Sequence, residues 1–89
     1  MAIVFIPYVL RKYCENKSIV EINASNLGEL IENLEKLYPG TKAHIIEDGA
    51  IKPGVAAVVN HTTTTKGLLE KIDKDSEIHF INAVSGGIS

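Results

Sequence analysis

The chain has 89 residues, a formal net charge of −2 and a single cysteine. A chain of this length forms one domain around one core, and it is too small to enclose a large active-site cleft. The mild acidic balance leaves no basic surface for phosphate contacts, so we expect no nucleic-acid partner. These properties favour a small carrier or binding module over a self-contained enzyme.

The first apolar stretch, residues 2–10, is too short to cross a membrane, contains Pro7 and lacks a basic leader. We therefore expect a cytoplasmic protein with no membrane partner. The lone Cys14 cannot form an internal disulfide or a cysteine-ligated metal site. We interpret it as a bystander in a turn beside Glu15 and Asn16.

Two strands are predicted at the start of the chain. Residues 2–6 (AIVFI) are apolar and β-branched, which favours a central strand buried on both faces, and Pro7 limits its ladder. Residues 18–22 (SIVEI) predict a second strand. A turn at residues 15–17 separates the two, so they are expected to pair antiparallel as a hairpin.

One long helix is predicted after Ser25 and Asn26, which are residues that cap helices. Apolar side chains then recur at helical spacing and form one stripe, with glutamates on the other side. The stripe consists of Leu27, Leu30, Ile31, Leu34 and Tyr38. Pro39 and Gly40 end the helix.

The second half predicts shorter elements. Residues 43–46 are interpreted as a short extra turn of helix, and residues 47–49 as a turn. Residues 55–60 (VAAVVN) and 77–81 (EIHFI) predict strands, and residues 61–65 predict a polar turn or a short edge strand.

The order of these elements places a single long helix on one face of a sheet, which indicates an α+β domain. Leu68, Leu69 and Ile72 are expected to form a small apolar cluster under a loop. We assign the domain to residues 1–82 and expect residues 83–89 to form a flexible C-terminal tail.

None of the common catalytic or metal-binding residue sets is present in the sequence. His44, His61 and His79 share no ligand spacing, so we interpret all three as structural and expect no metal site and no bound cofactor. His79 alternates with Ile78 and Phe80 along a predicted strand. It is therefore expected to face solvent or a partner.

The remaining feature with a chemical use is the C-terminal sequence Val84-Ser85-Gly86-Gly87. Glycine has no Cβ, so such a segment can enter a narrow channel that other side chains would block. An extended segment of five residues reaches roughly 16 Å into a partner enzyme. A terminal glycine carboxylate is open to activation there.

Residues 75–87 (DSEIHFINAVSGG) resemble the C-terminal signature of the β-grasp, ubiquitin-like sulfur carriers. These include the molybdopterin-synthase small subunit, the thiamine sulfur carrier and the carrier of bacterial cysteine synthesis. Residues 6–11 (IPYVLR) are similar to the Ile-Pro-x-x-Leu-Arg segment of the cysteine-synthesis branch, and residues 27–35 and 58–60 also fit. The resemblance implies a β-grasp fold, with a mixed four- to five-stranded sheet packed on one long helix.

The resemblance also implies a specific chemistry at Gly87. In this family, an adenylyltransferase related to ubiquitin-activating enzymes uses ATP to adenylate the final glycine carboxylate. Sulfur then displaces AMP to give a thiocarboxylate, which a sulfur-accepting synthase consumes. By this resemblance Gly87 carries the sulfur, and Val84, Ser85 and Gly86 thread the active sites of partners. The chain itself is not an enzyme and is expected to be a monomer when free.

The end of the chain departs from the family pattern in two ways. Ile88 and Ser89 follow Gly87, and the resemblance implies that a zinc metalloprotease of the deubiquitinase type cuts the Gly87–Ile88 bond. Asn82 stands where the family has proline, so we expect a less stiff approach to the tail.

A third departure concerns the partner-facing surface. The molybdopterin branch has large apolar residues at positions that read Pro7, Thr63 and Ile81 here. Only Ile81 keeps that character, which argues against a molybdopterin partner. Together with His79, these positions form the predicted partner-facing surface.

The sequence therefore predicts a sulfur carrier, processed to Gly87, that serves synthesis of cysteine or another sulfur-containing metabolite. Three alternatives stay open. The chain could act as a molybdopterin-synthase small subunit, or as a ubiquitin-like modifier attached through Gly87 to lysines. It could also be a non-catalytic binding module in which Ile88 and Ser89 are permanent.

Overall fold

The computed structural model describes residues 1–82, which form strands (β), one α-helix (α1) and three short 3-10 helices (η). In chain order these are β1 (Ala2–Phe5), η1 (Tyr8–Tyr13), β2 (Ile19–Ile22), α1 (Leu27–Leu37), η2 (Lys42–His44), β3 (Ile46–Glu47), β4 (Ala50–Ile51), β5 (Val55–Val59), β6 (Thr62–Thr63), η3 (Gly67–Leu69) and β7 (Glu77–Asn82). The tail predicted for residues 83–89 lies outside the described residues.

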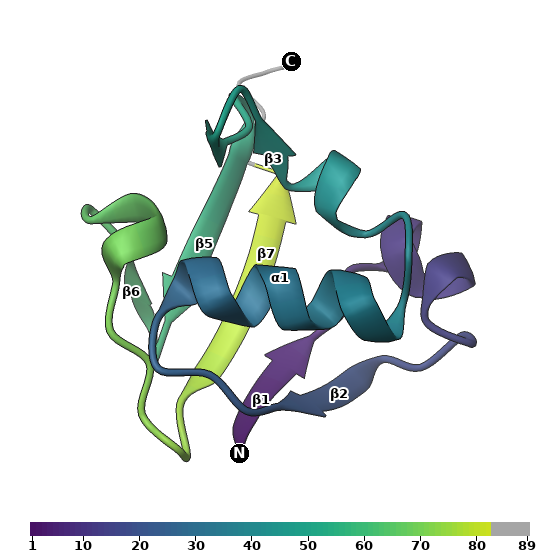
Figure 1. The fold of residues 1–89 in the computed structure, drawn as a ribbon, viewed down its shortest axis with the longest axis horizontal. Helices are drawn as coiled ribbons and strands as arrows, with labels where there is room; N and C mark the ends of the chain where they lie inside the picture. Colours follow the sequence, from purple (N-terminus) through teal and green to yellow (C-terminus); the bar gives the residue numbers. More distant parts are fainter. Residues whose placement is uncertain (83–89) are drawn as a thin grey trace.

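The main sheet has five strands in the order β2-β1-β7-β5-β6 (Figure 1). The predicted hairpin is confirmed, because β1 and β2 pair antiparallel. β7 pairs parallel with β1 and antiparallel with β5, so the sheet is mixed. The last strand of the described chain therefore occupies the centre of the sheet.

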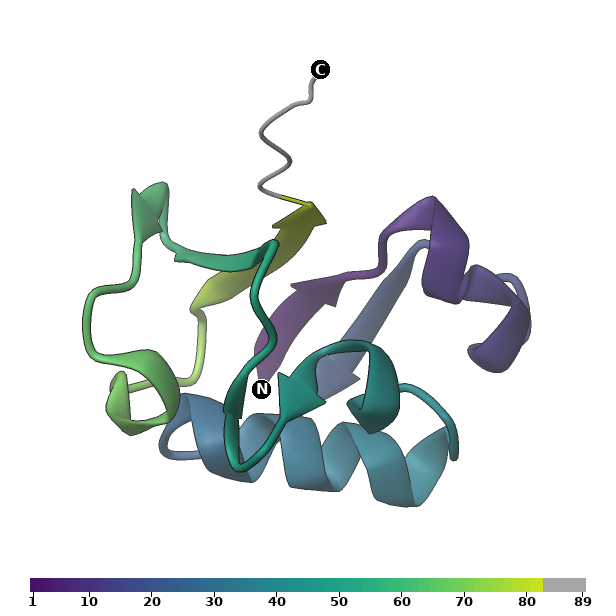
Figure 2. The same ribbon diagram turned by 90° about the horizontal axis from the view of Figure 1, so that it is seen from above.

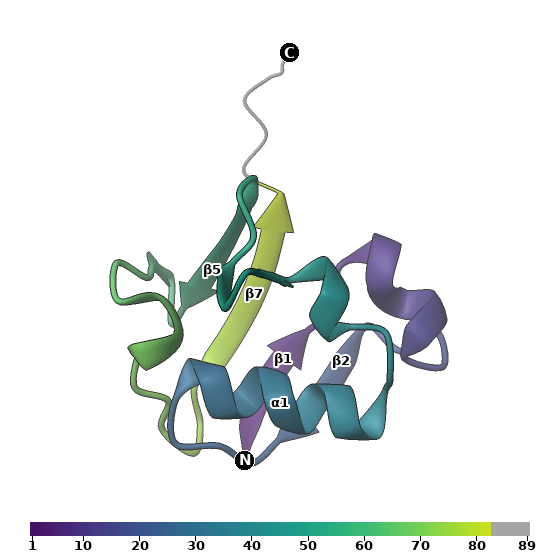
Figure 3. The same cartoon turned by 45° about the horizontal axis from the view of Figure 1, so that its top comes forward.

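The helix α1 lies across one face of the sheet, as Figures 1 and 3 show. Figure 2 views these two layers from a perpendicular direction, with α1 below the strands. Four residues of the predicted apolar stripe are fully buried between the layers: Leu27, Leu30, Ile31 and Leu34. Burial of each such side chain contributes about 1.5–3 kcal/mol. Packing of this stripe is therefore what joins helix and sheet.

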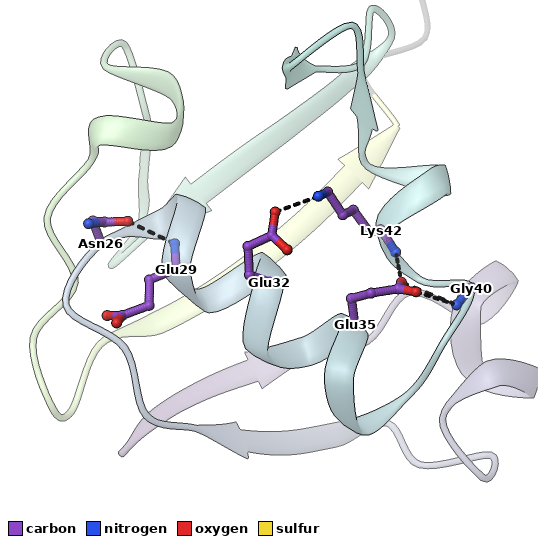
Figure 4. Close-up of polar contacts among 6 residues, drawn as sticks. All are labelled: Asn26, Glu29, Glu32, Glu35, Gly40 and Lys42. Carbon is purple, nitrogen blue, oxygen red and sulfur yellow. Dashed lines mark hydrogen bonds and ion pairs between the residues drawn. The ribbon is translucent and has the colours of Figure 1, made fainter.

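The first turn of α1 is held by reciprocal capping bonds, of which Figure 4 shows the one between Asn26 and Glu29. The Asn26 side chain accepts a hydrogen bond from the Glu29 backbone N–H at 2.8 Å. In return, the Glu29 carboxylate accepts from the Ser25 backbone N–H at 2.6 Å. These bonds to Ser25 hold the pKa of Glu29 below its ordinary value. The arrangement satisfies backbone donors that a helix start leaves free.

The loop after α1 is fixed by a glutamate of its last turns (Figure 4). The Glu35 carboxylate accepts hydrogen bonds from the backbone N–H groups of Lys42, at 2.9 Å, and Gly40, at 3.2 Å. These two bonds lower the pKa of Glu35. Gly40 has φ of +105°, and a Cβ there would lie 2.9 Å from the Tyr13 ring. Glycine is required at this position on both counts.

The prediction that residues 2–6 are buried on both faces is wrong. Ala2 and Val4 are buried, but Ile3 and Phe5 are only partly covered, because no element of the described chain packs on the second face of the sheet. An apolar run shows that a strand is suited to burial, but not which of its faces is covered.

Two further expectations need correction. Leu69 is 83% exposed and does not join Ile72 in the core, because η3 turns the side chain outward. Cys14 does lie at a turn, where Glu15 and Asn16 have positive φ, but its side chain is fully buried in the core. Burial raises the pKa of the Cys14 thiol.

Two structured segments were not expected from the sequence. The segment after Pro7 forms η1, which returns the chain toward β2. The turn at Asp48 and Gly49 joins β3 and β4 as a small antiparallel hairpin. η2 overlaps the extra turn expected at residues 43–46, although Ile46 lies in β3. For residues 61–65 the edge strand, one of the two alternatives predicted, is formed by β6.

Candidate partner interface

One row of side chains crosses the uncovered face of the sheet, which we call the outer face. Residues in register on neighbouring strands lie on the same face. Phe5 is in register with both Ile19 and His79, and Val58 is in register with both His79 and Thr63. The row therefore spans all five strands, with the predicted residues His79 and Thr63 in it.

The centre of this row is an aromatic pair. The rings of Phe5 and His79 stack with centroids 4.1 Å apart and an interplanar angle of 6°. Each ring covers one face of the other and restricts its rotation, so the exposed parts of the pair form a rigid surface at little further cost in side-chain entropy. The prediction that His79 faces outward agrees with this geometry.

A shallow groove of about 470 Å³ lies beside the stack on the outer face. Pro7, Ile19, His79 and Ile81 all contribute to its lining. Ile19 and Ile81 are 50% and 48% exposed, although both are large and apolar. The structure therefore brings three of the four predicted partner-facing residues together, Pro7, His79 and Ile81, and places Thr63 at the far edge of the sheet.

Sequence reasoning missed three residues of this surface. Phe5 and Ile19 belong to it because each sits at an outward position of its strand. The sequence contains one indication that Ile19 faces outward. Glu21 lies two positions from Ile19 in the second strand, so the two share a face, and the charged Glu21 favours exposure of that face. Arg11 also lines the groove, held by a hydrogen bond from its Nε to the Ile6 carbonyl oxygen at 3.1 Å.

Charge on the outer face is uneven. Glu21 and Glu77 both lie in register with Ile3, toward the starts of β1 and β7. Arg11 lies at the opposite end, where β7 leaves the sheet. The outer face thus has an acidic border at one end and an apolar surface with one guanidinium at the end nearer the tail.

The tail begins directly beside this surface. Asn82, the last residue of β7, is in register with Val55 of β5. The residues for which tail chemistry is predicted are all outside the described part of the chain: Val84, Ser85, Gly86, Gly87 and Ile88. The described residues show that this segment follows Asn82 at the end of β7.

Two further features of residues 1–82 concern metal ligands and membrane-spanning helices. Within residues 1–82, no group of three or more His, Cys, Asp or Glu side chains could hold a metal ion. His44 contacts the Tyr13 hydroxyl at 3.2 Å and lies apart from His79. Across the same residues, no helix has the length and apolar character needed to span a bilayer.

Several solved structures share this fold. A chain in the crystal structure of the BexX/CysO complex from Amycolatopsis orientalis matches with a TM-score of 0.91 and 24% identity, over 98% of this chain and 100% of that one. CysO from Mycobacterium tuberculosis matches with a TM-score of 0.88 and 24% identity, over 94% and 100%. The small archaeal modifier protein SAMP1 from Methanosarcina acetivorans has a TM-score of 0.81 and 20% identity, over 97% and 95%. The expected β-grasp fold is confirmed.

No curated protein matches the sequence. The ThiS family, by contrast, matches residues 4–87, which is nearly the whole chain and includes both glycines of the tail. This match agrees with the resemblance to the small sulfur carriers seen in the sequence. The chain belongs to the ThiS family.

Proposed function

We propose that this chain is a sulfur carrier that bears a thiocarboxylate on Gly87 once Ile88 and Ser89 have been removed. The observation that carries the proposal is the extent of the family match, which runs through Gly87 and leaves the last two residues outside. The chain is a protein-bound substrate in this role. The catalytic groups belong to the enzymes that act on it.

The proposed chemistry has two balanced steps. A carboxylate oxygen of Gly87 attacks the α-phosphorus of ATP on the activating enzyme, which forms the acyl adenylate and releases pyrophosphate. A sulfide donor then attacks the acyl carbon, and the C–O bond to AMP breaks. The product is a thiocarboxylate in which sulfur has replaced one oxygen. ATP is bound by the partner rather than by this chain.

The contribution of the chain itself is recognition and delivery. The stacked Phe5 and His79 rings, with Ile81 beside them, supply an apolar docking surface next to the departure point of the tail. Buried aromatic side chains commonly act as anchors in protein–protein interfaces. The five residues from 83 to 87 would span roughly 16–18 Å if extended, which is long enough to enter the active site of an enzyme docked beside them.

The sulfur serves biosynthesis of cysteine or of another sulfur-containing metabolite in this proposal. The motif in residues 6–11 and the fold shared with two CysO structures favour the cysteine branch. A sulfur-accepting synthase would complete the cycle. A zinc metalloprotease would first have to cut the Gly87–Ile88 bond, because a carboxylate on Ser89 is not the proposed reactive end.

Mass spectrometry tests the proposal directly. A chain produced to end at Gly87 is incubated with ATP, sulfide and the cognate activating enzyme. Its mass should rise by about 16 Da as sulfur replaces oxygen. The matched control is the chain ending at Ser89, which should show no change. An unchanged mass of the Gly87-ended chain, with an enzyme that is active on its own carrier, would refute the proposal.

A second candidate is a ubiquitin-like modifier joined through Gly87 to lysines of other proteins. The observation in its favour is the fold shared with the small archaeal modifier protein. Adenylation is common to both functions, but the modifier requires attack by an amine instead of sulfide. Isopeptide-linked Gly-Gly remnants on lysines of host proteins would support this candidate, and a chain found only as free carboxylate or thiocarboxylate would exclude it.

A further inference from the structure

A second concavity lies at the point where β7 ends, on the helix side of Ile81. It has a volume of about 220 Å³ and is enclosed by the start of η1, by η2, by the turn between β4 and β5 and by the end of β7. Figure 3 shows that turn beside the end of β7. We call it the tail-root cavity, and its walls include Pro7, Val9, Ile45, Lys52, Phe80 and Ile81.

The size of the cavity limits what it can hold. Pockets for cofactors and drug-sized ligands usually measure about 300–1,000 Å³. A volume of about 220 Å³ is below that range and suits a single large side chain. Nine of its eleven lining residues have an apolar side chain or none, and His44 and Lys52 supply the polar side chains, although polar atoms make up about half of the lining surface. A side chain with a large aliphatic or aromatic part fits the apolar side chains of this lining.

The position of the cavity indicates which protein supplies that side chain. Val55 lines the cavity and is in register with Asn82, so the mouth lies beside the departure point of the tail. Any enzyme that encloses the tail must also cover this mouth. Pro7 and Ile81 line both the cavity and the outer-face groove, so the two surfaces are continuous. Val9, at the mouth, is 51% exposed although it is apolar.

The charges around the cavity indicate a second feature of the partner. Lys52 makes no ion pair among residues 1–82, where the paired lysines are Lys17 and Lys42. His44 is already engaged by the Tyr13 hydroxyl at 3.2 Å. A carboxylate of the partner, placed beside the inserted side chain, would therefore face Lys52, which is the one lysine or arginine among the residues that line the cavity.

We propose that the tail-root cavity receives one large apolar side chain of the tail-activating enzyme, with an acidic residue of that enzyme facing Lys52. This inference rests on the proposed function and adds a second anchor to the outer face. The first anchor is the exposed surface around Phe5 and His79, whereas this one is a cavity. Together they fix the direction in which the tail leaves the sheet.

The test measures affinity of the Gly87-ended chain for its activating enzyme by calorimetry. Val9→Trp closes the mouth and should weaken binding at least tenfold. Lys52→Glu should weaken it severalfold, with an effect that diminishes at high salt. Leu69→Trp is the matched control, because it places the same bulky ring on an exposed position of η3, away from the cavity. It should bind as the unmodified chain does.

Unchanged affinity of a folded Val9→Trp chain would overturn the inference. If that variant fails to fold, backbone amide shifts of Ile45 and Phe80 in the unmodified chain decide instead: they should change on adding the enzyme, and no change overturns the inference. A change in the Ile45 shift on truncation after Asn82, before enzyme is added, would show that the chain's own end occupies the cavity, which also overturns it. Sulfur loading of the unmodified chain reports separately on the proposed function.

Discussion

The two faces of the sheet are built from the same strands but have opposite roles. Along β7, Ile78 and Phe80 point to α1 and are buried, whereas His79 and Ile81 point away and are partly exposed. Side chains on the inner face are fixed by packing against the helix. Those on the outer face contribute little to that packing, so their identity is free to serve recognition.

The largest expected effect is a loss of stability from a substitution on the inner face of the sheet. Ile78→Ala removes a fully buried side chain in the middle of the sheet and should lower the free energy of unfolding by about 2–5 kcal/mol. Ile81→Ala removes the same atoms from an exposed position of the same strand and should cost less than about 1 kcal/mol. Denaturant unfolding of both variants measures the difference. Equal losses would mean that the two faces are not distinct.

The second prediction concerns binding, for which the outer face should matter more than other exposed positions. Ile81→Ala should weaken binding to the activating enzyme by about tenfold or more, because it removes an apolar contact that the groove and the tail-root cavity share. Calorimetric titration of the Gly87-ended chain provides the affinity. Leu37→Ala, at an exposed apolar position of α1, is the control and should leave the affinity unchanged. Wild-type affinity in the Ile81 variant would contradict an outer-face interface.

The third prediction concerns the helix layer. Asn26→Ala deletes the side chain that caps α1 and should lower the free energy of unfolding by about 0.5–2 kcal/mol. Thr63→Ala, at an exposed edge position of the outer face, should change it by less than about 0.5 kcal/mol. Thermal unfolding compares the two variants. A larger loss from Thr63 would be inconsistent with an outer face that does not support the fold.

The smallest expected effect is a pH dependence. The folded-state pKa of Glu35 is lowered, so its bonds to Lys42 and Gly40 stabilise the fold above about pH 4.5 and are lost as the pH falls through the lowered value. Glu35→Gln lacks this titration. The difference in melting temperature between unmodified chain and variant should therefore shrink below about pH 4.5. A constant difference across acidic pH would contradict this role for Glu35.

The long helix and the main strands could be predicted from the sequence. The stripe from Leu27 to Leu34 and the strands around Val20 and Ile78 follow the spacing that each element imposes. The η1 segment could not be predicted, because its residues have no helical period and are positioned by contacts with the core. The burial of Cys14 escaped prediction for the same reason, since it depends on where η1 directs the chain.

The candidate interface was predictable only in part. His79 was found from its alternation with Ile78 and Phe80 along the strand, and Pro7 and Ile81 from the resemblance to the molybdopterin branch. Phe5 and Ile19 were not, because their exposure depends on which side of the sheet α1 covers, and this is a property of the assembled layers. The tail-root cavity joins four separate segments of the chain, so no local pattern could have indicated it.

The central position of β7 has a consequence for synthesis of the protein. This strand joins β1 to β5, so a chain interrupted before Asn82 lacks the strand that connects the two halves of the sheet. The hairpin of β1 and β2 must wait, with its apolar residues uncovered, until translation has nearly finished. Folding can therefore be completed only after the ribosome has synthesised β7, which directly precedes the segment that leads to Gly87. A chain that ends before β7 is therefore expected not to fold, because the two halves of the sheet have no strand between them.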